Sequence, residues 1–216
     1  MKHSKYISSI AELSESEGVF TTAQAARMGI PRDALHDAVE SGRIERIMHG
    51  AYRLVGSRSS YIDELVAIWK LTAPSKFTHE RIQVSSWDGI AIGGSTAASL
   101  LGIGDFYLSP YRIYTPKRIN SRNTATKFTK RDIARDEITF IDGLPVTCME
   151  RTIFDLVADA EDLSLVADTL NDAYDKDKQF DLAKLRNFFN SKYKEKRATY
   201  LYESLLLESD ISKGVS

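Results

Sequence analysis

The sequence predicts an α+β protein: an N-terminal winged helix-turn-helix domain over residues 1–58, then a mixed α/β domain over residues 59–216 that ends in helices. Three observations support this prediction. Short helical patterns, a tight turn and two β-prone runs follow one another within the first 54 residues. Strand-like runs and a concentration of basic residues occupy the middle of the chain. Beyond residue 162 the apolar residues keep helical spacing.

The winged domain begins with two short helices. Apolar residues at helical spacing over 7–13 predict the first helix. Thr21 and Gln24 have the spacing of a capping box, in which each side chain satisfies a free backbone N–H. They therefore predict an alanine-rich helix over 23–28, and Gly29 suits the left-handed position that ends it.

A third helix and a β-hairpin complete this module. Pro31 is favoured in a first helical turn because proline has no N–H to leave unsatisfied, so Pro31–Ser41 is predicted to be helical. The runs Ile44–Met48 and Ala51–Leu54 flank His49-Gly50, which suits a two-residue hairpin turn. In a helix-turn-helix module the second helix of the pair enters the DNA major groove, and we expect the hairpin to contact the flanking backbone.

Binding of DNA by this module would depend on a local patch of charge. Residues 1–58 hold eight Lys/Arg and seven Asp/Glu, a net charge of +1. Modules of this shape also serve as protein–protein adaptors, which is the alternative function. We expect base-edge contacts from Thr22, Arg32 and His36, and contacts to phosphate or the minor groove from Arg43, Arg46, His49 and Arg53.

The middle of the chain combines helices and strands. A helix is predicted over 61–71 after a polar linker, 56–60. Ser95 is expected to cap a short helix of small residues that Gly102 ends, and a strand follows over 111–114.

The last part of the chain is predicted to be a hairpin followed by helices. Asp142-Gly143 suits a type I′ turn between strands 138–141 and 144–146. Thr147 and Glu150 have capping-box spacing for the next helix. Three further helices are expected after residue 162, and Asp181 is expected to cap the second of them.

A basic segment over 112–135 is the sharpest charge feature, because it nets +7 in a chain whose total is −1. Its side chains could cover a solvated strand pair, or they could form a surface for nucleic acid or for an acidic partner. The candidates for this second surface are Arg112, Lys117, Arg118, Arg122, Lys127, Lys130 and Arg131.

Composition argues against several other classes of protein. The longest apolar runs are far shorter than the roughly 20 residues of a membrane-spanning helix, and no apolar signal core follows the basic N-terminus, so we expect a cytoplasmic protein. The single cysteine, Cys148, excludes an intramolecular disulfide and a Cys-cluster zinc site, and the four histidines form no metal-binding pair. We find no [DE]-x-K nuclease motif, no phosphate-binding glycine loop and no GxSxG, so we expect no cofactor, no metal and no enzymatic activity.

Several segments together resemble the AbiEi-type antitoxins and transcriptional regulators of type IV toxin–antitoxin systems. In the winged part these segments are Phe20–Ala26, Gly29–Arg32, Gly42–Arg46 and Gly50–Leu54, and later in the chain they are Ser95–Gly102, Asp142–Thr147 and Glu150–Leu156.

This resemblance implies two functions. The winged domain would bind inverted repeats of double-stranded DNA in its own promoter and repress the operon. The second domain would counter a nucleotidyltransferase-type toxin, in this class typically without a stable complex. The basic segment could also touch DNA, which would suit a monomer that binds cooperatively.

Overall fold

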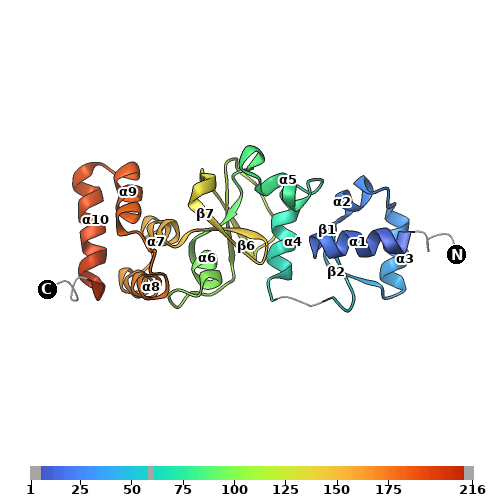
Figure 1. The fold of residues 1–216 in the computed structure, drawn as a ribbon, viewed down its shortest axis with the longest axis horizontal. Helices are drawn as coiled ribbons and strands as arrows, with labels where there is room; N and C mark the ends of the chain where they lie inside the picture. The colour runs from blue at the N-terminus through green and yellow to red at the C-terminus, as the bar shows by residue number, and fades with distance from the viewer. Residues whose placement is uncertain (1–5, 58–60, 212–216) are drawn as a thin grey trace. The chain divides into compact units, whose positions relative to one another are not determined.

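The computed structural model describes residues 6–57 and 61–211 and divides into two compact units, 1–88 and 89–216 (Figure 1). Each unit has its own sheet and its own core, and the predicted α+β class is confirmed. Part of the predicted linker, residues 58–60, lies outside the described residues, and so does the predicted domain boundary.

The first unit contains the predicted order of helices followed by a hairpin. Its strands form a three-stranded antiparallel sheet in the order β1-β3-β2. Its elements are α1 (Ile7–Glu17), β1 (Phe20–Thr21), α2 (Thr22–Arg27), α3 (Arg32–Glu40), β2 (Ile44–Met48), β3 (Ala51–Leu54), α4 (Asp63–Leu71), α5 (Thr78–Ile82) and the 3-10 helix η2 (Val84–Ser86).

Local sequence signals set the start of the helix-turn-helix. The Thr21 hydroxyl accepts from the backbone N–H of Gln24, and the Gln24 side chain accepts from the N–H of Thr21, so the capping box at α2 is confirmed. Gly29 adopts φ +75°, the left-handed conformation that glycine tolerates best. α3 begins one residue later than predicted: Pro31 is its N-cap, and Arg32 is its first helical residue.

One apolar core joins the first three helices to the hairpin. Leu13, Phe20, Leu35 and Ile44 are each at most 2 % exposed within it. A second cluster joins Val19, Ala51 and Ala67, so that α4 packs on the sheet as well. The division at residue 88 therefore places α4 and α5 with the winged module, although the sequence alone separated them from it.

The second unit is built on a mixed five-stranded sheet in the order β6-β5-β4-β8-β7. The β4–β8 and β5–β6 pairs are parallel, whereas β4–β5 and β7–β8 are antiparallel. Its elements are β4 (Ala91–Ile92), α6 (Gly94–Leu101), β5 (Tyr111–Thr115), β6 (Thr126–Lys130), the 3-10 helix η3 (Arg135–Glu137), β7 (Ile138–Ile141), β8 (Leu144–Thr147), α7 (Met149–Ala158), α8 (Leu163–Lys176), α9 (Leu182–Lys192) and α10 (Glu195–Glu208).

The final helices belong to this second unit. α7 packs against α6, α8 and α9, and α10 packs against α8 and α9 (Figure 1). The predicted cap of α9 is confirmed, because the Asp181 carboxylate accepts from two backbone N–H groups of its first turn.

Two other predicted caps in this unit are wrong. α6 begins at Gly94, and no side chain caps it. The N-cap of α7 is Cys148, one residue later than predicted, and the Thr147 hydroxyl contacts the hydroxyl of Thr152 at 2.7 Å.

Candidate nucleic-acid interface

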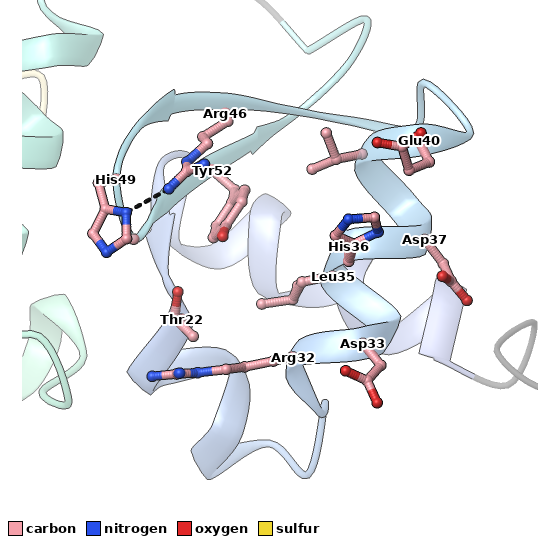
Figure 2. Close-up of a pocket in the computed structure, with 12 residues that line it drawn as sticks. Thr22, Arg32, Asp33, Leu35, His36, Asp37, Glu40, Arg46, His49 and Tyr52 are labelled. Carbon is pink, nitrogen blue, oxygen red and sulfur yellow. Dashed lines mark hydrogen bonds between the residues drawn. The ribbon is translucent and has the colours of Figure 1, made fainter.

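A groove with a volume of about 570 Å³ lies between α3 and the β2–β3 hairpin (Figure 2). α3 contributes one wall, and the hairpin with the start of α2 contributes the other. Its lining includes two arginines, two histidines and three carboxylates. The polar and small residues are Thr22, Arg32, Asp33, His36, Asp37, Glu40, Arg46, His49 and Gly50, and the larger apolar or aromatic ones are Leu35, Val39 and Tyr52.

α3 presents a polar face to this groove because its apolar residues are used in the core. Ala34, Leu35 and Ala38 are buried. Arg32, His36 and Glu40 are spaced four residues apart and therefore form one ridge along the exposed side. A helix with its polar ridge exposed next to a hairpin has the arrangement that reads a major groove.

The exposed polar side chains of α3 are arranged asymmetrically. Figure 2 shows Arg32 extending toward Thr22, whereas Asp33 and Asp37 lie on the opposite side of the helix. The negative charge of the two aspartates is therefore turned away from the hairpin, and the arginine is turned toward it.

The hairpin wall carries a coupled pair of basic side chains. The Arg46 guanidinium donates to Nδ1 of His49 at 2.5 Å (Figure 2). Because a guanidinium has only donors, Nδ1 must accept, and the ring proton then lies on Nε2. Both residues therefore keep N–H donors that can hydrogen-bond phosphate oxygens.

The turn of the hairpin is fixed relative to α2. The backbone N–H of Thr22 donates to the carbonyl of Gly50 at 3.0 Å. The register between β2 and β3 shifts between Arg46 and Met48, and such an irregularity bends a strand locally. These contacts hold the Thr22 hydroxyl beside the hairpin turn.

A buried polar junction ties α1 and α2 to α4 and α5. We call Glu17, Gln24, Lys70 and Thr78 the Glu17 junction. The side chains of Glu17 and Lys70 are 4 % and 3 % exposed, and Lys70 Nζ donates to Glu17 Oε2 at 2.5 Å. Burial lowers the pKa of Lys70, and the Glu17 carboxylate opposes that shift.

Every polar atom of the two charged groups in this junction has a partner. Lys70 Nζ also donates to the Glu17 carbonyl and to the Thr78 hydroxyl. The Glu17 carboxylate accepts in addition from the Thr78 hydroxyl and the Gln24 amide at Oε2, and from the Thr78 backbone N–H at both oxygens. A buried ion pair is tolerated only when its remaining hydrogen bonds are satisfied in this way.

Two further contacts join α2 to the segment between α4 and α5. The Thr21 hydroxyl donates to the Pro74 carbonyl at 2.5 Å. The Arg27 guanidinium forms a two-pronged pair with Glu80 at 2.6 and 2.8 Å, and it also lies 4.4 Å above the Phe77 ring. These contacts, together with the Glu17 junction, therefore hold α4 and α5 against α1 and α2.

The structure brings five of the seven predicted DNA contacts to the groove: Thr22, Arg32, His36, Arg46 and His49. Arg43 lies outside it, next to a more apolar pocket of about 290 Å³ that also contacts α1. Arg53 requires a correction, because its side chain is only 11 % exposed and is paired with Glu45 and Asp63. The Arg53 guanidinium is therefore engaged within the protein and is not among the DNA contacts proposed below.

Sequence reasoning did not give a role to the three carboxylates of the groove, Asp33, Asp37 and Glu40. A signal for Glu40 was available, because it stands eight residues after Arg32 and thus on the same helical ridge.

The predicted second basic surface loses two of its members. Arg131 pairs with Asp155 and Asp159, and Arg112 pairs with Asp159 and Glu161. Both guanidiniums are therefore neutralised by acids of α7 and the loop after it. The exposed basic residues that remain are Lys117, Arg118, Arg122, Lys127 and Lys130.

Cys148 is a free cysteine and is partly buried. Burial raises the pKa of the Cys148 thiol to about 11, which disfavours the reactive thiolate. Within residues 6–57 and 61–211, no cluster of three His, Cys, Asp or Glu side chains is placed to hold a metal ion. In the same described ranges, no helix has both the length and the apolar character needed to cross a membrane.

A solved structure and a family model are similar to this chain. The chain resembles the crystal structure of the RV2827C protein from Mycobacterium tuberculosis, with a TM-score of 0.58 and 16% sequence identity over 95% of this chain and 80% of that chain. At this identity the likeness shows a shared fold. No curated protein matches the chain significantly.

A family model described as "Transcriptional regulator, AbiEi antitoxin" matches residues 8–55. The matched residues include all of α1 except Ile7, together with α2, α3 and the complete hairpin, and hence both walls of the groove. The N-terminal segment of this chain is therefore similar to the AbiEi family of antitoxin transcriptional regulators.

Proposed function

We propose that this protein represses its own promoter by binding inverted repeats of double-stranded DNA through the groove between α3 and the hairpin. The observation that carries the proposal is that Arg32 and His36 of α3 share this groove with Arg46 and His49 of the hairpin. The helix would read base edges, and the hairpin would hold the flanking phosphates.

A salt titration of duplex binding tests this proposal. The full chain and an inverted repeat from its own promoter are compared with the Arg46→Ala variant in gel shifts. If Arg46 contacts phosphate, the variant weakens binding to all sequences alike and lowers the slope of log K against log salt by about one unit. Arg32→Ala should instead cost about 1–3 kcal/mol and relax specificity at one position.

The control for these variants is Lys196→Ala, which removes one positive charge from an exposed position on α10. If Lys196→Ala changes the slope as much as Arg46→Ala, the groove is not the binding surface. If the wild type gives no shift at low salt, the result contradicts DNA binding and is the one expected of the alternative, a protein-interaction adaptor.

We further propose that the protein is the antitoxin of a nucleotidyltransferase-type toxin and acts on it in the cytoplasm, without enzymatic activity and without a stable complex. The family match over residues 8–55 supports this assignment. If the adjacent gene encodes the toxin, co-expression of this protein should relieve the growth arrest that the toxin causes. A pull-down with the two proteins at micromolar concentrations should recover no complex. Cleavage of DNA by the purified chain in magnesium or manganese would contradict the absence of enzymatic activity.

The exposed part of the second basic surface supports a role in cooperative binding by monomers. Lys117, Arg118, Arg122, Lys127 and Lys130 are solvent-exposed, and all lie in β6 or in the segment between β5 and β6. Reversing Lys127 and Lys130 to glutamate should lower the Hill coefficient on a two-repeat duplex but leave affinity for a single repeat unchanged. Sedimentation of the free chain as a dimer would contradict the monomer.

A further inference from the structure

The two walls of the groove differ in charge, although both would face the same DNA. The hairpin wall holds Arg46 and His49, whereas α3 holds Arg32, His36 and three carboxylates, of which Asp33 and Asp37 are turned away from the hairpin (Figure 2). Carboxylates beside a phosphate backbone oppose binding, so general attraction to DNA does not explain their presence. Their position on the helix that would read the bases requires a separate explanation.

Helix stability accounts for Asp33 but not for Glu40. Asp33 lies in the first turn of α3, where a negative charge is favoured by the helix dipole. Glu40 is the last residue of α3, where a negative charge is disfavoured. Over the described ranges 6–57 and 61–211, Glu40 has no ion pair and no side-chain hydrogen bond, and it is exposed.

Glu40 stands on the ridge that the groove presents. It follows Arg32 and His36 at intervals of four residues, and all three side chains line the groove (Figure 2). Eight residues of helix correspond to about 12 Å along the axis. Bases on one strand are about 3.4 Å apart, so the backbone positions of Arg32 and Glu40 are separated by about the rise of four bases.

The chemistry of a carboxylate limits which base it can read. An ionised glutamate only accepts hydrogen bonds. In the major groove the donors are N4 of cytosine and N6 of adenine, whereas guanine O6 and N7 and thymine O4 are acceptors that would repel it. Cytosine is the usual partner of glutamate, and guanine is the usual partner of arginine.

We propose that Glu40 is a specificity-determining residue that selects cytosine in each DNA half-site, within about four base pairs of a guanine selected by Arg32. Glu40 raises specificity at a cost in affinity, because it rejects sites that present an acceptor at its position. This inference rests on the proposed binding of DNA by the groove.

Selection from a pool of randomised duplexes tests the proposal, using the full chain at one fixed salt concentration. The wild type should enrich cytosine at one position per half-site, and replacing that cytosine with guanine should weaken binding about 5- to 150-fold. Glu40→Gln should shift the preference at that position alone toward adenine, because glutamine pairs with N6 and N7 of adenine. Glu40→Ala should remove the preference at that position and leave the others unchanged.

A matched control separates this effect from a general change in charge. Glu12→Gln makes the same substitution at an exposed position of α1 outside the groove, and it should select the same sequences as the wild type. If the Glu40 variants select the same sequences as the wild type, the proposal is overturned while DNA binding stands. If no duplex is enriched by the wild type, the proposed function is overturned, and this proposal with it.

Discussion

The Glu17 junction offers a quantitative test of how α4 and α5 support the DNA-binding face. We consider Glu17→Gln, which keeps the shape of the side chain and removes its charge. Lys70 would then remain 3 % exposed, with a positive charge and no counter-ion. Removing one partner of a buried ion pair costs about 3–5 kcal/mol, so the 1–88 unit should lose about that much unfolding free energy. Lys70→Met should cause a similar loss.

The coupling between the two residues distinguishes a true ion pair from two separate losses of packing. In the double variant Glu17→Gln/Lys70→Met neither charge is left unpaired. Its loss of unfolding free energy should therefore be smaller, by at least about 2 kcal/mol, than the sum of the losses in the two single variants.

The pH dependence of the single variant has a definite sign. Burial already lowers the pKa of Lys70 below its ordinary value of 10.5, and removing the Glu17 carboxylate lowers the pKa further. Between the lowered pKa of Lys70 in the folded state and 10.5, the folded state binds fewer protons than the unfolded state. The unfolding free energy of the variant therefore rises with pH in that range. The deficit of Glu17→Gln should thus shrink as the pH approaches 10.5.

Urea unfolding followed by tryptophan fluorescence measures these changes in the 1–88 unit alone, because the two tryptophans of the chain are Trp69 and Trp87. Glu12→Gln on the exposed side of α1 is the control and should change stability by less than about 0.5 kcal/mol. A loss below about 1 kcal/mol in either single variant, or strict additivity in the double variant, would refute the role given to this pair.

Three further predictions follow from contacts already described. Arg53→Met should lower the stability of the 1–88 unit by about 1–3 kcal/mol, because the guanidinium is engaged by two carboxylates. For the same reason it should leave the salt slope of DNA binding unchanged; a changed slope would mean that Arg53 does contact phosphate. The Arg27 guanidinium and a backbone N–H lower the pKa of Glu80 to about 2, so its stabilisation should be present above about pH 4.5 and fade as the pH falls toward 2. Acid unfolding of Glu80→Gln should lack that component, and an unchanged acid profile would argue against the pair. Gly93→Ala should destabilise the second unit by about 1–3 kcal/mol or more in thermal unfolding, because the added Cβ would lie 1.9 Å from a ring carbon of Tyr114; a neutral effect would mean that the ring can move aside.

Sequence alone was sufficient where short-range contacts decide the structure. The capping box of Thr21 and Gln24 joins residues three positions apart, and the turn at Asp142-Gly143 uses positive φ values of 48° and 80°. The sequence likewise predicted the third helix, and the structure places its Arg32 and His36 in the groove.

The family resemblance also depended on local segments. The matched residues, 8–55, are those whose helices and hairpin could be predicted from the sequence one after another. The order of the elements in the DNA-binding module was therefore predictable, because each element depends on its own caps, turns and periodicity.

Only the tertiary structure showed which basic residues are available to a partner. Arg53 is paired with Asp63, ten positions away, and Arg131 and Arg112 are bonded to acids 28 and 49 positions away. Lys70 and Glu17, which brace the module, are 53 residues apart. A count of charged residues in the sequence treats all these charges as exposed. Only folding brings together the opposite charges that neutralise them, because the pairing of distant side chains depends on how the elements pack and not on their spacing along the chain.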